Sequence, residues 1–504
     1  MRLRTKILVA LSIFVVSYST RSLHAVDLTP VMYTAEQPFG GLTLTYDQRA
    51  SSILEGEGIL GPYDINPSRT VWVAQAPGYS IYLSWIYRIA GRGFLKVQLV
   101  QNALNSLSPI LIFLIAGSIV SWRVGVVSGF LAAIEHHLSH ISNFILPDSI
   151  SALPLLAAIY FLVLATRLRH DSYWLWAAAG ALLGSAAWFR AQTMLLAPFV
   201  AVILVVIAAR RTTRLKRAVV LPLTCFLVIA PITIKNYLVY GEFVPIHIGL
   251  GIVLWEGIAD ASGDRFGAVA LDVDVAAQDA LIYDNPRYGG SWSTPDGIAR
   301  DRDRIRKSMD IILHHPVWYA GVMVRRMREM VKYSAHAPLV YKISQVGTLE
   351  RSLPVKPEWE SLVGDDSSLS FGKAIFWVRP AIRALQRLIK EPMGYFILAG
   401  ALLMFAASWR RAIFLGMTPL YYFLFQSFTH TEFRYTLPMQ YFLFVFAAIT
   451  WVVLTGWTWK TLRSVFKRYA AGANQPNTPR WIIAMTILTG RYRNKNYRNR
   501  DSFP

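Results

Sequence analysis

The sequence predicts an all-α polytopic membrane protein with about ten transmembrane helices, outer-face juxtamembrane helices and a large extracytoplasmic region. Of its 504 residues, 54% are hydrophobic and 16% are charged, whereas charged residues make up about a quarter of a typical soluble chain. Basic residues concentrate in alternate breaks between the apolar runs, so the net charge of +21 indicates membrane topology and not nucleic-acid binding. The single cysteine, Cys225, excludes an internal disulfide and a cysteine-based metal site.

The chain begins with a basic segment followed by an apolar run at residues 7–25. We interpret this run as a retained transmembrane helix, although a cleaved signal peptide ending near Ala25 would have the same pattern. Residues 26–96 then form a first outer loop. Within it, residues 81–90 are apolar but too short to span a membrane, which predicts an interfacial helix.

A short surface helix is predicted near Asp47. Either Thr45 or Asp47 is suited to cap its first turn, and Gly56 and Gly58 are suited to end it. Its apolar stripe consists of Tyr46, Ala50, Ile53 and Leu54. The spacing would also be explained if Asp47 did no more than cap this helix.

Nine further apolar spans follow, at 97–119, 124–143, 151–166, 173–189, 192–209, 218–234, 393–408, 412–428 and 436–456. The segments that ten spans assign to the cytoplasm hold 23 Lys/Arg and 2 Asp/Glu, which equals the whole net charge of +21. This asymmetry predicts that both termini are cytoplasmic. We expect four parts: a membrane module at 1–235, an extracytoplasmic region at 236–391, the last membrane helices at 392–456 and a basic cytoplasmic tail at 457–504.

Ionisable residues gather at the predicted outer ends of the spans: Asp47, Asp148, Arg190, Lys235 and Arg434. Charges at this depth are costly unless they are paired, so acids and bases together suggest a polar site just above the bilayer. The bases would hold a phosphate, and an acid would take a proton from an incoming hydroxyl. The alternative is that each residue is a snorkelling anchor.

A histidine-rich segment lies in the predicted third span. His136 and His140 are one helical turn apart and could bind a divalent metal with Glu135 as a third ligand. A polar cluster lining a cavity is the alternative. A divalent metal is the only cofactor that the sequence suggests.

Several short motifs occur in a characteristic order along the chain: Asp47 in a short helix, Pro77-Gly78-Tyr79, Leu146-Pro147-Asp148, Phe189-Arg190, the segment from Lys235 to Gly249, His315-Pro316, and Phe433-Arg434-Tyr435. This order resembles the GT-C membrane glycosyltransferases, and among them the protein mannosyltransferases and the lipid A aminoarabinose transferases. The resemblance covers roughly residues 1–456 and depends on order and placement more than on any one motif.

The resemblance implies roles for the clustered residues. Asp47 matches the aspartate that acts as general base, and Asp148 matches the acid of the second outer loop. Arg190, Lys235 and Arg434 occupy positions of donor-phosphate contacts. The implied reaction is inverting transfer of a hexosyl or pentosyl group from a polyprenyl-phosphate sugar to a lipid, glycan or protein acceptor. We expect it at the outer face of a bacterial cytoplasmic membrane.

Two other functions remain open from the sequence. A transporter or flippase of lipid-linked sugars would need polar groups near the middle of the bilayer, where this chain has few. A polysaccharide ligase or polymerase would also combine a large outer loop with basic residues, and the sequence does not separate it from the transferase.

Overall fold

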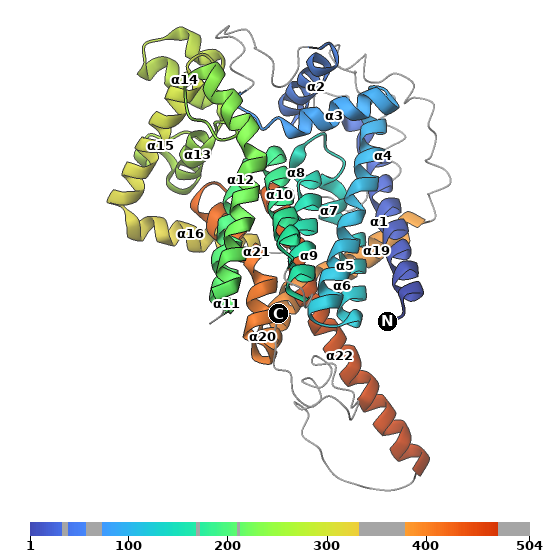
Figure 1. Ribbon diagram of the computed structural model, residues 1–504. Coiled ribbons are helices and arrows are strands. Elements are labelled where there is room, and N and C mark those ends of the chain that lie inside the picture. Colours follow the sequence, from blue (N-terminus) through green and yellow to red (C-terminus); the bar gives the residue numbers. More distant parts are fainter. Residues whose placement is uncertain (33–38, 57–72, 168–171, 209–211, 332–377, 472–504) are drawn as a thin grey trace.

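The computed structural model is built of helices (Figure 1). The residues that it describes are 1–32, 39–56, 73–167, 172–208, 212–331 and 378–471. Every regular element within these ranges is an α- or 3-10 helix. The all-α membrane fold predicted from the sequence is therefore confirmed. Residues 472–504 of the predicted basic tail lie outside the described ranges.

Apolar helices form the central bundle, in which they run side by side (Figure 1). They are α1 (Leu3–Met32), α4 (Phe94–Asn105), α5 (Leu107–Ile119), α6 (Trp122–Ile134), α9 (Ala152–Arg167), α10 (Tyr173–Phe189), α11 (Leu196–Ala208), α12 (Thr212–Tyr240), α20 (Met393–Ala407), α21 (Trp409–Phe428) and α22 (Leu437–Ala471). A bend of 51° separates α20 from α19 (Val378–Lys390), which precedes it.

Five stretches of the described chain are long and apolar enough to cross a membrane, and a sixth is added if the bent pair of α19 and α20 counts as one. They are Leu3–Ala25, Phe94–Ile119, Pro147–Thr166, Ala218–Tyr240 and Phe433–Thr458. Helices α6, α10, α11 and α21 coincide with four further predicted spans. The protein is an integral membrane protein, and the count of ten spans stays a prediction.

Close helix–helix packing in the bundle depends on glycine. A Cβ atom on Gly184 would lie 2.6 Å from the carbonyl oxygen of Cys225, where α10 meets α12. A Cβ atom on Gly400 would lie 1.8 Å from the carbonyl oxygen of Phe446, where α20 meets α22. Small residues let helix backbones approach closely, as is typical of membrane helix interfaces. This packing holds the bundle that carries the site.

The third predicted span, 124–143, is divided and not one continuous helix. Helix α6 ends at Ile134, Glu135 is extended, and α7 (His136–Ile141) follows. The Glu135 carboxylate accepts a hydrogen bond of 2.6 Å from the backbone N–H of Leu138, so this residue caps α7. The prediction of one continuous span is therefore wrong, because the chain leaves the helical conformation at the polar segment Glu135-His136-His137.

Two helices cover one end of the bundle: α2 (Gly40–Leu54) and α3 (Gly78–Ala90) (Figure 1). The prediction that Thr45 or Asp47 caps α2 is wrong, because the helix begins at Gly40 and Asp47 lies in its middle. Gly56, with φ of 92°, follows its last residues, as predicted for a helix end. Helix α3 occupies the predicted interfacial segment and leaves Trp85 and Ile89 68% and 79% exposed.

Residues 250–331 form a helical module beside this end of the bundle (Figure 1). Its elements are α13 (Leu250–Ser262), η3 (Gly263–Phe266), α14 (Asp272–Ile282), η4 (Pro286–Gly290), α15 (Gly297–His314) and α16 (Pro316–Val331). The module has its own apolar core, centred on Trp255, Ile258, Val275 and Tyr319.

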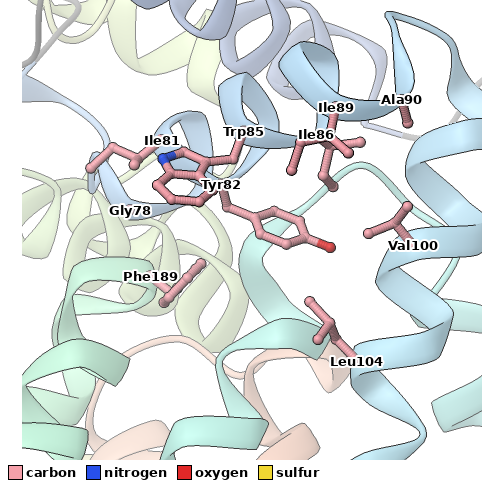
Figure 2. Close-up of a pocket in the computed structure, with 10 residues that line it drawn as sticks. All are labelled: Gly78, Ile81, Tyr82, Trp85, Ile86, Ile89, Ala90, Val100, Leu104 and Phe189. Carbon is pink, nitrogen blue, oxygen red and sulfur yellow. The ribbon is translucent and has the colours of Figure 1, made fainter.

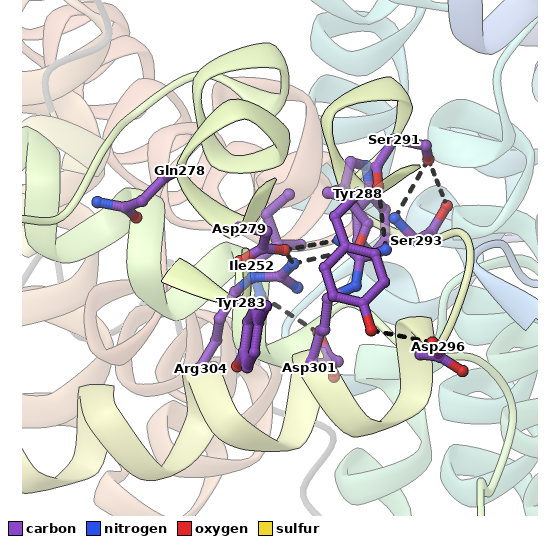
Figure 3. A network of polar contacts seen from close by, with 12 residues as sticks. Ile252, Gln278, Asp279, Tyr283, Tyr288, Ser291, Ser293, Asp296, Asp301 and Arg304 are labelled. Carbon is purple, nitrogen blue, oxygen red and sulfur yellow. Dashed lines mark hydrogen bonds and ion pairs between the residues drawn. The ribbon is translucent and has the colours of Figure 1, made fainter. Parts of the chain in front are cut away.

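A buried polar network braces this module (Figure 3). Asp279 accepts hydrogen bonds from Arg304 and from Arg300, the latter at 2.7 Å. Asp301 on α15 accepts a 3.0 Å hydrogen bond from the backbone N–H of Gly251, at the start of α13. A carboxylate is favourable at a helix N-terminus, so the network fixes where α13 begins. The loop from α12 to α13 is thereby held over the bundle.

Candidate active site

Asp148 and Arg190 form an ion pair at the end of the bundle beneath α2 and α3, in which the Asp148 side chain is fully buried and that of Arg190 is 22% exposed. Asp148 lies in the first turn of α8 (Pro147–Ile150), and Arg190 lies in the extended break between α10 and η2 (Ala191–Leu195). Nη2 of Arg190 donates to Oδ1 of Asp148. Oδ2 of Asp148 and Nε of Arg190 are buried and have no hydrogen-bond partner among the described residues. Such atoms are costly unless a ligand or water satisfies them.

A second arginine faces the same group from η7 (Phe433–Thr436). The guanidinium carbon of Arg434 lies 4.9 Å from the ring centroid of Tyr435, and that of Arg190 lies 4.5 Å from the same ring. Nη2 of Arg434 donates to Oε1 of Glu432 at 3.0 Å, and its Nε donates to Oε2. Arg434 is 9% exposed and Glu432 is about one third exposed. The two arginines and the tyrosine thus form one compact basic group.

Asp47 is held from α3 and from the turn after it. Its carboxylate accepts hydrogen bonds from the Tyr87 hydroxyl at 2.7 Å and from Nε of Arg92 at 3.0 Å, and its second oxygen accepts from Nη2 of Arg92. The Asp47 side chain is fully buried, whereas that of Arg92 is 36% exposed. Burial, reinforced by the Asp47 carboxylate, raises the pKa of Tyr87, so its phenol stays protonated and donates.

Tyr46 connects these two groups. It is buried next to Asp47 on α2, and burial raises its pKa while the charges of Arg190, Arg49 and Arg434 oppose that rise. The Tyr46 ring packs edge-on against that of Tyr79 on α3, with centroids 5.1 Å apart, so α2 presents both Tyr46 and Asp47 to α3. No described hydrogen bond joins Asp47 directly to Asp148.

A third basic group lies where α12 meets the loop before α13. Lys235 is 9% exposed, and its Nζ lies 5.4 Å from the ring centroid of Tyr240. Arg49 lies near enough to act electrostatically on Lys235 and on His247. Burial lowers the pKa of His247 to about 4, with further lowering by Arg190 and Arg49, so this imidazole is neutral at pH 7. Contacts thus join three of the five predicted charged residues, Asp148, Arg190 and Arg434, into one group, while Asp47 and Lys235 belong to the two other groups.

The predicted metal ligands do not gather into one site. Nδ1 of His136 lies 3.1 Å from Oε1 of Glu135, but the His140 ring packs edge-on against Phe144 at 5.0 Å. The part of the chain that the structure describes contains no group of three His, Cys, Asp or Glu side chains able to hold a metal ion. The geometry gives the metal hypothesis no support. His137 instead packs against Phe433, with ring centroids 3.8 Å apart.

Several residues of this region were not assigned from the sequence: Arg49, Tyr87, Arg92, His247 and Glu432. Two of them carry a local signal. Arg49 follows Asp47 by two residues, and Arg92 stands between Gly91 and Gly93, where Gly91 has a φ of 82°. An arginine between two glycines has an unusually free backbone, which is typical of a functional turn.

An apolar pocket of about 410 Å³ lies between α3, α4 and the end of α10 (Figure 2). It is lined by Gly78, Ile81, Tyr82, Trp85, Ile86, Ile89, Ala90, Val100, Leu104 and Phe189. Phe189 directly precedes Arg190. A Cβ atom on Gly78 would lie 2.5 Å from the carbonyl oxygen of Trp188, so the glycine of Pro77-Gly78-Tyr79 lets α3 rest on the end of α10. The pocket wall and the arginine are therefore fixed relative to each other.

The chain is similar to one protein family over part of its length and to several solved structures. Residues 74–234 match the model of the family Dolichyl-phosphate-mannose-protein mannosyltransferase. No curated protein matches the chain. The chain is similar in structure to the Archaeoglobus fulgidus oligosaccharyltransferase AglB in complex with an inhibitory peptide and a dolichol-phosphate, with 14% identity, a TM-score of 0.46, and coverage of 95% of this chain and 56% of that one.

A second structural similarity is to ArnT from Cupriavidus metallidurans bound to undecaprenyl phosphate, with 12% identity, a TM-score of 0.36, and coverage of 91% of this chain and 80% of that one. The chain spans about half the length of the archaeal oligosaccharyltransferase. The family match covers α3 to α12, which carry Asp148, Arg190 and the apolar pocket. Over residues 74–234 the match agrees with the resemblance to the protein mannosyltransferases.

Proposed function

We propose that this protein transfers a sugar from a polyprenyl-phosphate donor to an acceptor hydroxyl at the outer face of the membrane, with inversion at the anomeric carbon. The observation that carries the proposal is the junction of Phe189 and Arg190. The first residue closes an apolar pocket, and the second begins the basic group. A ligand with a long apolar tail and an anionic head fits such a junction, because each part meets matching chemistry.

The phosphate of the donor would bind between Arg190 and Arg434. Nε of Arg190 is a buried donor without a described partner, and an anionic oxygen would satisfy it. Both guanidinium groups already have a carboxylate neighbour, Asp148 for Arg190 and Glu432 for Arg434. The pairs keep the charges compensated while the site is empty. Lys235, with Arg49 nearby, would add positive charge as the phosphate leaves.

Asp47 is proposed as the general base. A carboxylate has about four acceptor positions, and Tyr87 and Arg92 take three of those of Asp47. The remaining position would accept the hydroxyl of the sugar acceptor. Because Arg92 is partly exposed and flanked by glycines, it can turn aside to admit that hydroxyl, whereas Tyr87 is buried and keeps the carboxylate oriented.

The chemistry requires only one base. The acceptor oxygen attacks the anomeric carbon, its proton passes to Asp47, and the bond between the anomeric carbon and the phosphate oxygen breaks. The electron pair of that bond leaves with polyprenyl phosphate, whose charge is met by Arg190 and Arg434. A single displacement inverts the anomeric configuration. Asp148, with its unpartnered Oδ2, would orient the acceptor or sugar.

The proposed orientation puts the site on the outer face of a bacterial cytoplasmic membrane. Its support is the concentration of positive charge in the segments between spans at the opposite end of the bundle. In this orientation both termini are cytoplasmic, and residues 236–391, including the module of residues 250–331, are outside. The acceptor would be a lipid, a glycan or a protein, and the sugar a hexose or pentose.

The experiment that tests the proposed activity uses purified protein in detergent or vesicles. Polyprenyl-phosphate sugars extracted from cells lacking the protein are offered together with membranes from those cells. Release of polyprenyl phosphate and transfer of the sugar to an acceptor are measured. Release by the parent protein, absent without it, supports a transferase, whereas movement of intact donor across vesicles without release indicates a transporter.

A further inference from the structure

Helix α16 presents two different faces. Tyr319 and Val322 are buried on one of them, in the core of the module of residues 250–331. On the opposite face, Val317 and Val324 are 86% and 66% exposed. Their spacing of seven residues, about two helical turns, places them in one stripe along α16. A stripe of large, exposed apolar side chains on a helix indicates a contact with another apolar surface.

The buried face of α16 ties it to the end of a bundle helix. The Tyr319 hydroxyl donates to the carbonyl oxygen of Phe428, the last residue of α21. Nη1 of Arg326 donates to the carbonyl oxygen of Ser427 at 3.0 Å. Helix α16 runs across the direction of the neighbouring bundle helices (Figure 1). It therefore lies where α21 reaches the end of the bundle, at the level of η7 and the candidate site.

The exposed faces of α16 and of the preceding helix, α15, differ in charge. The exposed face of α15 is charged, with Arg306, Lys307 and Asp303 close to one another. The exposed charges of α16 are confined to its last turns. They are Arg325, Arg328 and Glu329, with Nη2 of Arg328 3.8 Å from Oε1 of Glu329. An apolar stripe that ends in basic residues is typical of a helix lying in the headgroup region of a bilayer.

We propose that the stripe of Val317 and Val324 on α16 lies in the outer leaflet of the membrane, with Arg325 and Arg328 at the phosphates of anionic lipids. Interfacial helices bury their apolar face about 5–10 Å into the boundary between headgroups and acyl chains. Basic residues next to that face are attracted to anionic headgroups. The assignment to a lipid surface does not depend on the glycosyltransferase activity.

The contact would link the membrane surface to the candidate site. On the other side of α16, Arg326 also donates to the carbonyl oxygens of Gly257 and Thr429. Thr429 precedes His430, whose Nδ1 lies 2.9 Å from Oδ2 of Asp260 and whose Nε2 lies 4.0 Å from Oε1 of Glu432. The same helix thus contacts the lipid surface and binds the segment that contains Glu432, the ion-pair partner of Arg434.

Site-directed fluorescence measures this contact in the full chain. Buried Cys225 is replaced by Ser, and single cysteines are introduced as Val317→Cys, Val324→Cys and, as the control on α15, Arg306→Cys. The protein is labelled and reconstituted into vesicles of phosphatidylcholine with or without phosphatidylglycerol. Lipids bearing a nitroxide on the upper acyl chain report lipid contact, and aqueous iodide reports exposure to water.

The proposal expects lipid nitroxides to quench the labels at 317 and 324 several-fold more than the label at 306, and iodide to give the reverse order. It expects phosphatidylglycerol to increase quenching at 324, and Arg325→Gln with Arg328→Gln to remove that increase. Iodide quenching at 317 and 324 equal to that at 306 overturns the proposal. Shielding of both labels from lipid and water also overturns it, because a protein segment would then cover the stripe. Thermal unfolding midpoints equal to that of the parent show that each labelled variant is folded.

Discussion

The Arg190 guanidinium lies 4.5 Å from the ring centroid of Tyr435. The two segments that meet here are far apart in the sequence, since 244 positions separate Phe189, which precedes Arg190, from Phe433, which precedes Arg434. Arg434 lies 4.9 Å from the same ring. A cation over an aromatic face is attracted by the ring electrons. One tyrosine thus holds two guanidinium groups near each other without neutralising either, which suits a site for a doubly charged phosphate.

Arg434→Leu should weaken donor binding. Loss of one charged hydrogen bond to the phosphate corresponds to about 1.5–3 kcal/mol of binding free energy. Binding of a polyprenyl phosphate to purified protein measures this directly. The matched control is Arg306→Leu, which removes an arginine whose side chain is 79% exposed on α15. Equal affinity of the Arg434 variant and the control would remove Arg434 from the phosphate site.

Asp47→Asn should abolish turnover while leaving donor binding in place. The amide keeps the shape of the side chain but cannot take the proton of the acceptor, so kcat should fall by on the order of 10²-fold or more. Asp148→Asn should chiefly raise KM, because its proposed role is to orient substrate beside Arg190. Steady-state kinetics of both variants decides the matter. If kcat fell in Asp148→Asn and stayed at the parent value in Asp47→Asn, the two roles would have to be exchanged.

Filling the apolar pocket should weaken the use of donors with long tails more than that of donors with short tails. Leu104 lines the pocket, and Leu104→Trp would occupy part of its 410 Å³. We expect a higher KM for a long polyprenyl-phosphate sugar and little change for a donor with a short, water-soluble tail. Leu402→Trp is the control, since Leu402 is an exposed bundle residue outside the pocket. Equal losses with long and short donors would show that the tail binds elsewhere.

The module of residues 250–331 should lose stability as the pH rises. Burial, with Asp272 next in effect, raises the pKa of Glu256 to about 9. Between the ordinary glutamate pKa of about 4.3 and that value, the unfolded chain releases a proton that the folded chain keeps, so folding becomes less favourable with increasing pH. Glu256→Gln should flatten the dependence of the unfolding midpoint on pH across this window.

The control for that measurement is Glu242→Gln, which alters an ion pair with Arg302 whose side chains are both nearly half exposed. Its unfolding midpoint should follow the parent profile. Parallel profiles for Glu256→Gln and the parent would show that the Glu256 carboxyl is not protonated in the folded module.

Topology offers a prediction independent of chemistry. A reporter fused after residue 300 should be extracytoplasmic, and one fused at the carboxyl terminus should be cytoplasmic, because the net positive charge falls in the segments that the ten-span prediction assigns to the cytoplasm. Both fusions can be read with paired reporters that are active on opposite sides of the membrane. Either reporter on the other side would contradict the ten-span topology.

The sequence predicted the apolar helices and the placement of Asp148, Arg190 and Arg434 near one end of the bundle, since hydropathy and span boundaries are local properties. It did not predict that Asp148 pairs with Arg190, or that Asp47 pairs with Tyr87 and Arg92. These contacts join segments about 40 residues apart, and single-sequence patterns carry no signal for them.

The position of Asp47 within its helix was missed for a related reason. Capping preference favours an aspartate at the first turn, but α2 begins at Gly40, and tertiary contacts with α3 hold the Asp47 side chain. The break at Glu135 falls at the polar segment Glu135-His136-His137, where the Glu135 carboxylate caps α7. For Asp47, packing between elements overrode a local preference.

The most direct test of the central claim is the fate of the polyprenyl-phosphate sugar that accumulates in cells carrying only Asp47→Asn. That lipid is purified and incubated with the parent protein or with the Asp47→Asn protein, and the polyprenyl phosphate released is quantified. We expect one such lipid to accumulate in the variant cells, the parent protein to convert it, and the variant to convert it on the order of 10²-fold more slowly or not at all. Absence of any accumulated polyprenyl-phosphate sugar, or its equal conversion by both proteins, would contradict the account.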